Sequence, residues 1–94
     1  MIVRIVEMSF REDAIEEFVA LFREARPTIL SFPGCTNLDL LQDSKRLHVF
    51  FTYSHWDSEE HLDRYRYSEF FRETWGKTKA LFDDVPQVWS LVKR

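Results

Sequence analysis

Hydrophobic residues gather in four segments that predict strands, and in residues 35–42 they alternate with polar residues, as side chains do when they point in turn to the two faces of a sheet. The first, third and fourth segments are rich in β-branched and aromatic residues, which favour strands. A polar turn from Asp43 to Arg46 joins the second segment to the third and predicts an antiparallel hairpin. The four predicted strands are residues 2–10, 35–42, 47–56 and 88–92.

After the first strand, hydrophobic residues recur every three or four positions, which is the spacing of one helical face. This helix is predicted to begin at Glu12. Pro27 lacks a backbone donor, so we expect a kink or break near Arg26 before a last turn that reaches Phe32. The apolar face consists of Ile15, Phe18, Val19, Phe22, Ala25 and Ile29.

A second helical region follows the third strand and is predicted to be divided in two. Asp57 or Ser58 can cap its start, and Glu60 would complete a capping box from Asp57. Tyr67 and Ser68 offer a second cap, which opens a third helix. The apolar face of that helix carries Phe70, Phe71, Thr74, Trp75, Thr78, Leu81 and Phe82, and Asp83, Asp84 and Pro86 are expected to end it.

The order strand, helix, strand, strand, helix, strand predicts an α+β fold, the ferredoxin-like βαββαβ arrangement. Right-handed crossovers give this order a four-stranded antiparallel sheet with its helices on one face. The other face would carry apolar and aromatic side chains that no helix can cover. A second copy packed sheet to sheet would bury them, so we expect a homodimer through the sheet faces.

Composition narrows the classes of function. The chain has 94 residues, enough for one domain, and its aromatic fraction of 16% exceeds what a core of this size usually holds, so some rings should meet a ligand or a second chain. A net charge of −3 without a basic patch argues against nucleic acid and membrane partners. Cys35 is the only cysteine, and no signal peptide is apparent, so we expect a cytoplasmic protein.

The turn formed by Pro33, Gly34 and Cys35 and the segment FTYSHWDSEEHLDRYRYSEFFRETW, residues 51–75, resemble the antibiotic biosynthesis monooxygenase (ABM) family. Members carry a Trp at the end of strand three, then a polar residue, a Ser and acidic residues, and later a Ser that opens the third helix. The corresponding residues here are Trp56, Asp57, Ser58, Glu59, Glu60 and Ser68. The resemblance implies one ABM-like domain over residues 1–94 that forms a dimeric α/β barrel.

The resemblance also implies an activity: a cofactor-independent monooxygenase, or a quinol-type oxygenase, that acts on a small apolar aromatic substrate without flavin or metal. Heme-degrading members use an Asn, a Trp and a His where this chain has Val6, Tyr65 and Trp75, so heme degradation is disfavoured. Two alternatives stay open, a non-catalytic module that binds a small ligand and a purely structural homodimer. A pocket with an inward histidine, a pocket without one, and no pocket would distinguish the three.

An oxygenase of this kind needs a base, a dry aromatic pocket and donors that hold a substrate anion. His48, His55 and His61 are the candidate bases, because histidine ionises near neutral pH. His48 and His55 fall on opposite faces of the third strand, whereas His61 forms a possible helical stripe with Asp57 and Tyr65. The three histidines are scattered and lack cysteine partners, so no metal site is expected.

Aromatic residues are the candidates for substrate binding. Gly76, which follows Trp75, leaves room for a ligand to approach, although Trp75 could equally belong to a buried helix stripe. Tyr65 is a further catalytic candidate, since its hydroxyl could donate to a substrate oxygen. Arg4 and Asn37 could face the interior or water. The predicted substrate-binding residues are Trp56, Tyr67, Phe71 and Trp75.

Overall fold

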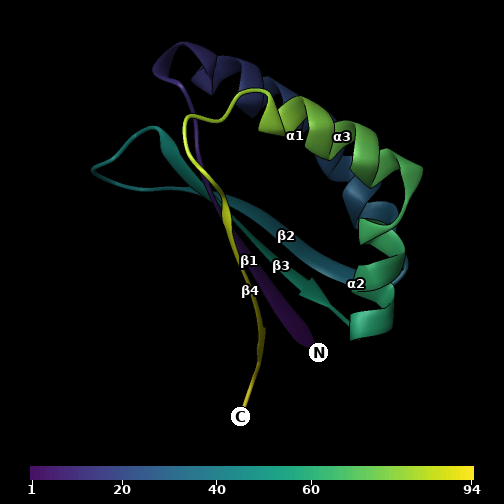
Figure 1. The fold of residues 1–94 in the computed structure, drawn as a ribbon. Coiled ribbons are helices and arrows are strands. Elements are labelled where there is room, and N and C mark those ends of the chain that lie inside the picture. The colour runs from purple at the N-terminus through teal and green to yellow at the C-terminus, as the bar shows by residue number, and fades with distance from the viewer.

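The computed structural model describes all 94 residues as a four-stranded sheet and a layer of three α-helices (Figure 1). The strands are β1 (Ile2–Ser9), β2 (Cys35–Gln42), β3 (Val49–Trp56) and β4 (Gln87–Val92). The helices are α1 (Ile15–Ser31), preceded by a short 3₁₀ helix (Glu12–Ala14), α2 (Glu59–Arg66) and α3 (Glu69–Lys79). Every predicted strand is present, with ends displaced by at most two residues.

The sheet has the strand order β2-β3-β1-β4, and every neighbouring pair is antiparallel. Figure 1 shows α1 and α3 side by side along one face of this sheet, with α2 at one end of the same helical layer. The opposite face carries no helix. This arrangement confirms the predicted α+β ferredoxin-like fold.

The sequence predicts a kink or a break near Arg26; helix α1 runs without interruption through Pro27 to Ser31, so a break there is wrong. Proline leaves the carbonyl of the residue four positions earlier, here Arg23, without its usual donor. Both residues are exposed, and water can satisfy that carbonyl. On the opposite side of the helix, Ile29 is buried against the sheet, and this packing holds the last turn in helical register.

The predicted second cap is present, and the predicted first cap is present in part. The Ser58 hydroxyl accepts the backbone N–H of His61 at 3.3 Å, and the Ser68 hydroxyl accepts that of Phe71 at 3.1 Å. The capping box from Asp57 to Glu60 is not formed, because Asp57 lies one residue before the cap.

Helix α3 ends at Lys79, earlier than predicted. The chain turns there towards β1, and the Asp83 amide donates to the Ser9 carbonyl at 3.0 Å. Leu81 and Phe82 therefore leave the helix but still reach the core: Leu81 is buried, and Phe82 forms an isolated bridge with Phe10.

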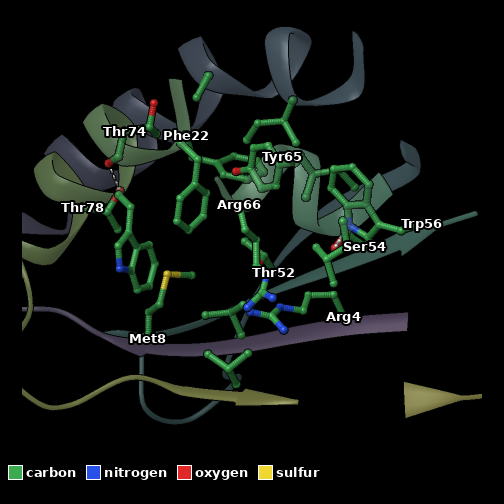
Figure 2. Close-up of a pocket in the computed structure, with 18 of the residues that line it drawn as sticks. Arg4, Met8, Phe22, Thr52, Ser54, Trp56, Tyr65, Arg66, Thr74 and Thr78 are labelled. Atoms are coloured by element: carbon green, nitrogen blue, oxygen red, sulfur yellow. Dashed lines mark hydrogen bonds between the residues drawn. The ribbon is translucent and has the colours of Figure 1, made fainter. Parts of the chain in front are cut away.

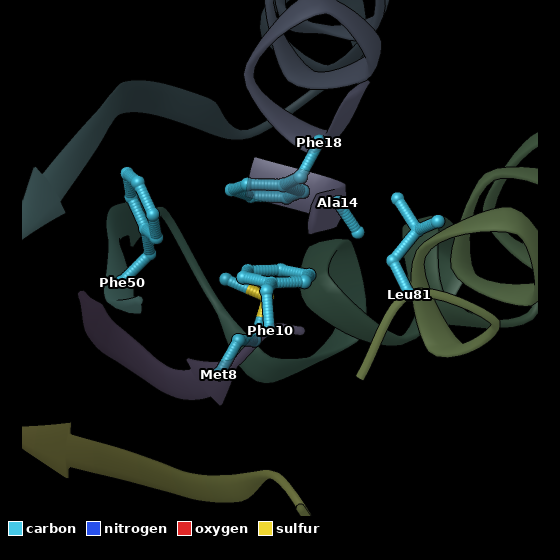
Figure 3. Packing of buried hydrophobic residues seen from close by; sticks show 6 residues of the cluster. All are labelled: Met8, Phe10, Ala14, Phe18, Phe50 and Leu81. Carbon is cyan, nitrogen blue, oxygen red and sulfur yellow. The ribbon is translucent and has the colours of Figure 1, made fainter. Parts of the chain in front are cut away.

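Two hydrophobic clusters join the helices to the sheet. In the first, the Phe10 and Phe18 rings stack with their centroids 4.0 Å apart (Figure 3). The buried residues of this cluster are Met8, Phe10, Ala14, Phe18, Phe50 and Leu81. The second cluster lies farther along the sheet, and its buried residues are Ala25, Ile29, Leu38, Trp56 and Leu62.

The outer face of the sheet carries apolar side chains in register across the strands. Ile5 of β1 pairs with Tyr53 of β3 on one side and with Trp89 of β4 on the other. Trp89 is 40% exposed and Leu91 is 46% exposed. We refer to this surface, formed by Val3, Ile5, Phe51, Tyr53, Trp89 and Leu91, as the open face. None of the helices is long and apolar enough to cross a membrane.

Candidate active site

A cavity of about 360 Å³ lies between the helical layer and the sheet (Figure 2). Of its 21 lining residues, 15 are hydrophobic, and they come from β1, β2, β3, β4 and all three helices. The volume lies at the small end of the range for pockets that hold organic ligands. The site is therefore suited to one small, largely apolar molecule.

A run of aromatic rings forms one wall of this cavity. Trp56 at the end of β3 stacks on Tyr65 of α2, with centroids 5.1 Å apart and the planes at 21°. The Tyr65 ring meets Phe71 of α3 edge to face at 5.0 Å, and Phe71 stacks on Trp75 at 5.8 Å. A planar aromatic ligand would find both stacking and edge contacts along this wall.

Two arginines project into the same cavity. Arg4 lies on the helix-facing side of β1, and Arg66 descends from the end of α2 towards it (Figure 2). Arg4 Nη1 donates to Ser90 Oγ at 2.8 Å, and Arg66 Nη2 pairs with Asp63 Oδ1 at 2.7 Å. Arg66 Nε is buried and donates to no acceptor.

Burial, followed by the charge of Arg66, lowers the pKa of Arg4. An arginine keeps its proton at neutral pH even so. No carboxylate is among the lining residues. The cavity thus combines an apolar, aromatic wall with guanidinium groups that have spare hydrogen-bond donors.

Tyr65 is the one tyrosine with an inner position in the aromatic wall. Burial raises the pKa of Tyr65. At neutral pH its side chain is therefore a phenol that can donate a hydrogen bond, and it is a poor base. Figure 2 shows the hydroxyl oxygen on the side of the ring that faces Phe22.

The structure brings five of the sequence-predicted residues to this cavity. Four of them form the aromatic wall described above, and Tyr67, which is 75% exposed, lies at its rim. The five are Tyr65, Trp56, Tyr67, Phe71 and Trp75. Their roles in binding or catalysis remain predictions.

None of the three histidines lines the cavity. His48 lies in the turn before β3. His55 lies between Ser54 and Trp56 in β3, whose side chains face the cavity, so its own side chain points to the outer face of the sheet. His61 packs against the Gly34 turn, and its Nδ1 atom is 2.7 Å from the Ser58 hydroxyl. A role for any of them as the base stays a prediction, without support from their placement.

Arg4 and Asn37 are two other polar residues of the strands, and they lie on opposite faces of the sheet. Arg4 faces the cavity, whereas Asn37 faces the outer side of the sheet and donates to Asp39 at 3.2 Å.

Gly76 has nothing within 4 Å of the place where a side chain would begin, so no group uses the space that its missing side chain leaves. Burial raises the pKa of the Cys35 thiol, which keeps it protonated and unreactive.

Sequence reasoning missed Arg66. The spacing of Leu62, Tyr65 and Arg66, three and four residues apart, places all three on one face of α2. Since Leu62 is a natural core residue of that helix, its spacing to Arg66 would have predicted an inward guanidinium. A charged residue at an apolar helical position is the signal that was available.

The fold and the cavity define a small ferredoxin-like domain with an apolar, aromatic-walled cavity between its helices and its sheet. The family model described as antibiotic biosynthesis monooxygenase matches residues 1–76, which is most of the chain, and the chain belongs to that family. A comparison with curated protein sequences finds no match.

Solved structures with the same fold cover the whole length. A crystal structure of an antibiotic biosynthesis monooxygenase has a TM-score of 0.93 at 22% identity and covers 100% of this chain and 99% of its own. A conserved protein from Methanosarcina mazei Go1 has a TM-score of 0.93 at 19% identity, with 100% and 94% covered. A variant of SnoaB, a cofactor-independent oxygenase from Streptomyces nogalater, has a TM-score of 0.89 at 15% identity, with 99% and 92% covered.

Proposed function

We propose that this protein is a monooxygenase that acts on a small apolar aromatic substrate in the cavity between helices and sheet, without flavin or metal. The observation that carries the proposal is one cavity with a continuous aromatic wall and two guanidinium groups. Membership of the ABM family supports it, as does a fold shared with a cofactor-independent oxygenase.

The chemistry needs an electron-rich substrate with an acidic hydroxyl or enol. A guanidinium close to such a group lowers its pKa by about 1–3 units, which favours the anion without a protein base. The anion transfers electrons to O₂. One oxygen atom enters the substrate and the other leaves as water, while a CH₂ group becomes a carbonyl or a hydroquinone becomes a hydroxyquinone.

The side chains that line the cavity would serve this reaction in three ways. Arg4 and Arg66 would hold the substrate anion, and the Tyr65 phenol would donate to a second substrate oxygen. The aromatic wall would orient the ring system and exclude bulk water, which strengthens the attraction between anion and guanidinium. The proton lost by the substrate would leave to solvent past the exposed Tyr67 rim.

Oxygen consumption by the purified protein tests the proposal. Protein freed of flavin and treated with a chelator is mixed with an anthrone or a naphthohydroquinone under isotopically labelled O₂. We expect O₂ uptake above the spontaneous rate and one labelled oxygen in the product. The Trp75→Ala variant, which shortens the aromatic wall, should lower the rate. A broad panel of such substrates without turnover would contradict the proposal.

A second candidate is a non-catalytic module that binds a small aromatic ligand. It is favoured by one observation: the cavity is a pocket without an inward histidine, which is the arrangement expected of such a module, and its lining residues include no carboxylate that could accept a proton. This module would bind aromatic molecules in the same cavity with no oxygen uptake. Parallel measurements of binding and oxygen consumption on the same compounds therefore separate the two candidates.

We also propose that the protein forms a homodimer in which the open faces of two copies pack together. The support is the row of apolar side chains on that face, among them Trp89 and Leu91, which no helix of the same chain covers. Exposed apolar surfaces of this kind are typical of protein interfaces. The cavity lies on the other side of the sheet, so both faces can be occupied at once.

A further inference from the structure

The charges around the cavity do not balance. Arg4 and Arg66 both reach into it, and Asp63 is the only carboxylate in contact with either guanidinium. Arg4 is held by a neutral hydroxyl, that of Ser90, rather than by an acid. Two positive charges thus face one negative charge, which leaves one positive charge uncompensated beside an apolar space.

Both arginines are half-buried, and an unpaired charge in such a place loses part of its hydration, a cost that pairing with an anion offsets. The Nε atom of Arg66 adds a second cost, because a buried donor without an acceptor loses its hydrogen bonds to water. The two guanidiniums also repel each other, which contributes to the lowered pKa of Arg4. A single anionic group between the two guanidiniums would pair the uncompensated charge and relieve their repulsion.

We infer that the cavity takes its aromatic ligand as a monoanion, with an oxyanion seated against the guanidinium groups of Arg4 and Arg66 and the rings against Phe71 and Trp75. A carboxylate and a phenolate share this chemistry, since each presents a singly charged oxygen on a flat apolar body. A neutral ring would leave the guanidiniums unpaired, and a cation would be repelled. The inference rests on the proposed function only for the aromatic nature of the ligand, because anion binding needs no turnover.

Matched probes test the charge preference. We compare 2-naphthoate with 2-naphthalenemethanol, its neutral analogue, and measure each dissociation constant by calorimetry. Charge-assisted hydrogen bonds predict that the anion binds at least about tenfold more tightly. A second arm uses 2-naphthol, whose absorption changes on ionisation. If the cavity selects the phenolate, the bound form has the naphtholate spectrum at a pH where free naphthol is neutral.

Arginine variants assign the preference to the site. Arg66→Gln and Arg4→Gln should each weaken naphthoate binding about tenfold or more while changing binding of the neutral alcohol less than about twofold. Arg64→Gln is the matched control, because Arg64 lies on the same helix, is exposed and does not line the cavity. Retained binding of the alcohol also shows that each variant is folded.

The outcomes separate this inference from the proposed function. Tight naphthoate binding without oxygen uptake by any substrate supports the inference and contradicts the oxygenase. Oxygen uptake that is unchanged in both cavity arginine variants supports the oxygenase and overturns the inference. Equal affinity for naphthoate and the alcohol, together with no ionised naphthol, overturns the inference whatever the enzymatic result. An equal loss in the Arg64 variant also overturns it, because the effect would then be one of net charge.

Discussion

Filling the cavity should abolish its function without harm to the fold. Ala25 is a small residue of α1 that is 7% exposed and lines the cavity beside Phe22 and Ile29. Ala25→Leu adds three carbon atoms that can enter the empty volume of about 360 Å³. At about 0.8 kcal/mol for each buried carbon group, the gain in stability is at most about 2 kcal/mol.

The matched control is Ala20→Leu, on the same helix at an exposed position. It makes the same chemical change with no cavity to fill, so its stability should shift by no more than about 0.5 kcal/mol. Urea denaturation gives the free energy of unfolding for both variants and the wild type. Calorimetry with 2-naphthoate and oxygen uptake give the functional readout.

We expect Ala25→Leu to be as stable as the wild type or more stable, and to bind naphthoate at least about tenfold more weakly. The control should bind as the wild type does. A loss of more than about 1 kcal/mol in Ala25→Leu, with binding unchanged, would refute the reasoning. It would mean that the space beside Ala25 is already filled, as overpacking of a close-packed core predicts.

Three further substitutions test other parts of the structure. Phe51→Asp puts a carboxylate on the open face and should convert the dimer to monomer or unfold the chain; unchanged sedimentation and melting would contradict the proposed interface. Ser58→Ala removes the cap of α2 and should cost about 1 kcal/mol in urea denaturation, whereas Ser58→Thr should cost less. Asp43 accepts the backbone N–H groups of Arg46 and Lys45, which lower its pKa from 3.8 to about 2. Its contribution to stability is therefore complete above about pH 4 and lost as the pH falls to about 2, and Asp43→Asn should remove this part of the acid dependence, as urea midpoints across that range would show.

Most of the fold is encoded in local patterns, which is why the sequence predicts it. The β-branched and aromatic residues of 2–10 and 47–56 favour strands, and Ser58 and Ser68 favour helix starts; the structure retains all of these local preferences. The break predicted at Pro27 fails because the rule for proline ignores exposure. A freed carbonyl on the solvent side of a helix is satisfied by water, and packing on the other side decides the outcome.

The candidate site was predictable only in part. Helical spacing finds Phe71 and Trp75, since aromatic residues on an apolar face point inwards. The same spacing applied to α2 would have found Arg66. A search for side chains that ionise near neutral pH selects the three histidines instead. Which histidine reaches the cavity depends on the tertiary arrangement: strand parity turns His55 outwards, and the Gly34 turn covers His61.

The central claim is that the cavity holds an aromatic anion, and a crystal structure of the protein with 2-naphthoate tests it most directly. The account predicts density for the naphthalene rings along the aromatic wall, with a carboxylate oxygen within hydrogen-bond distance of the guanidinium group of Arg4 or Arg66. Naphthoate seated on the open face, with the cavity between helices and sheet free of ligand, would contradict it.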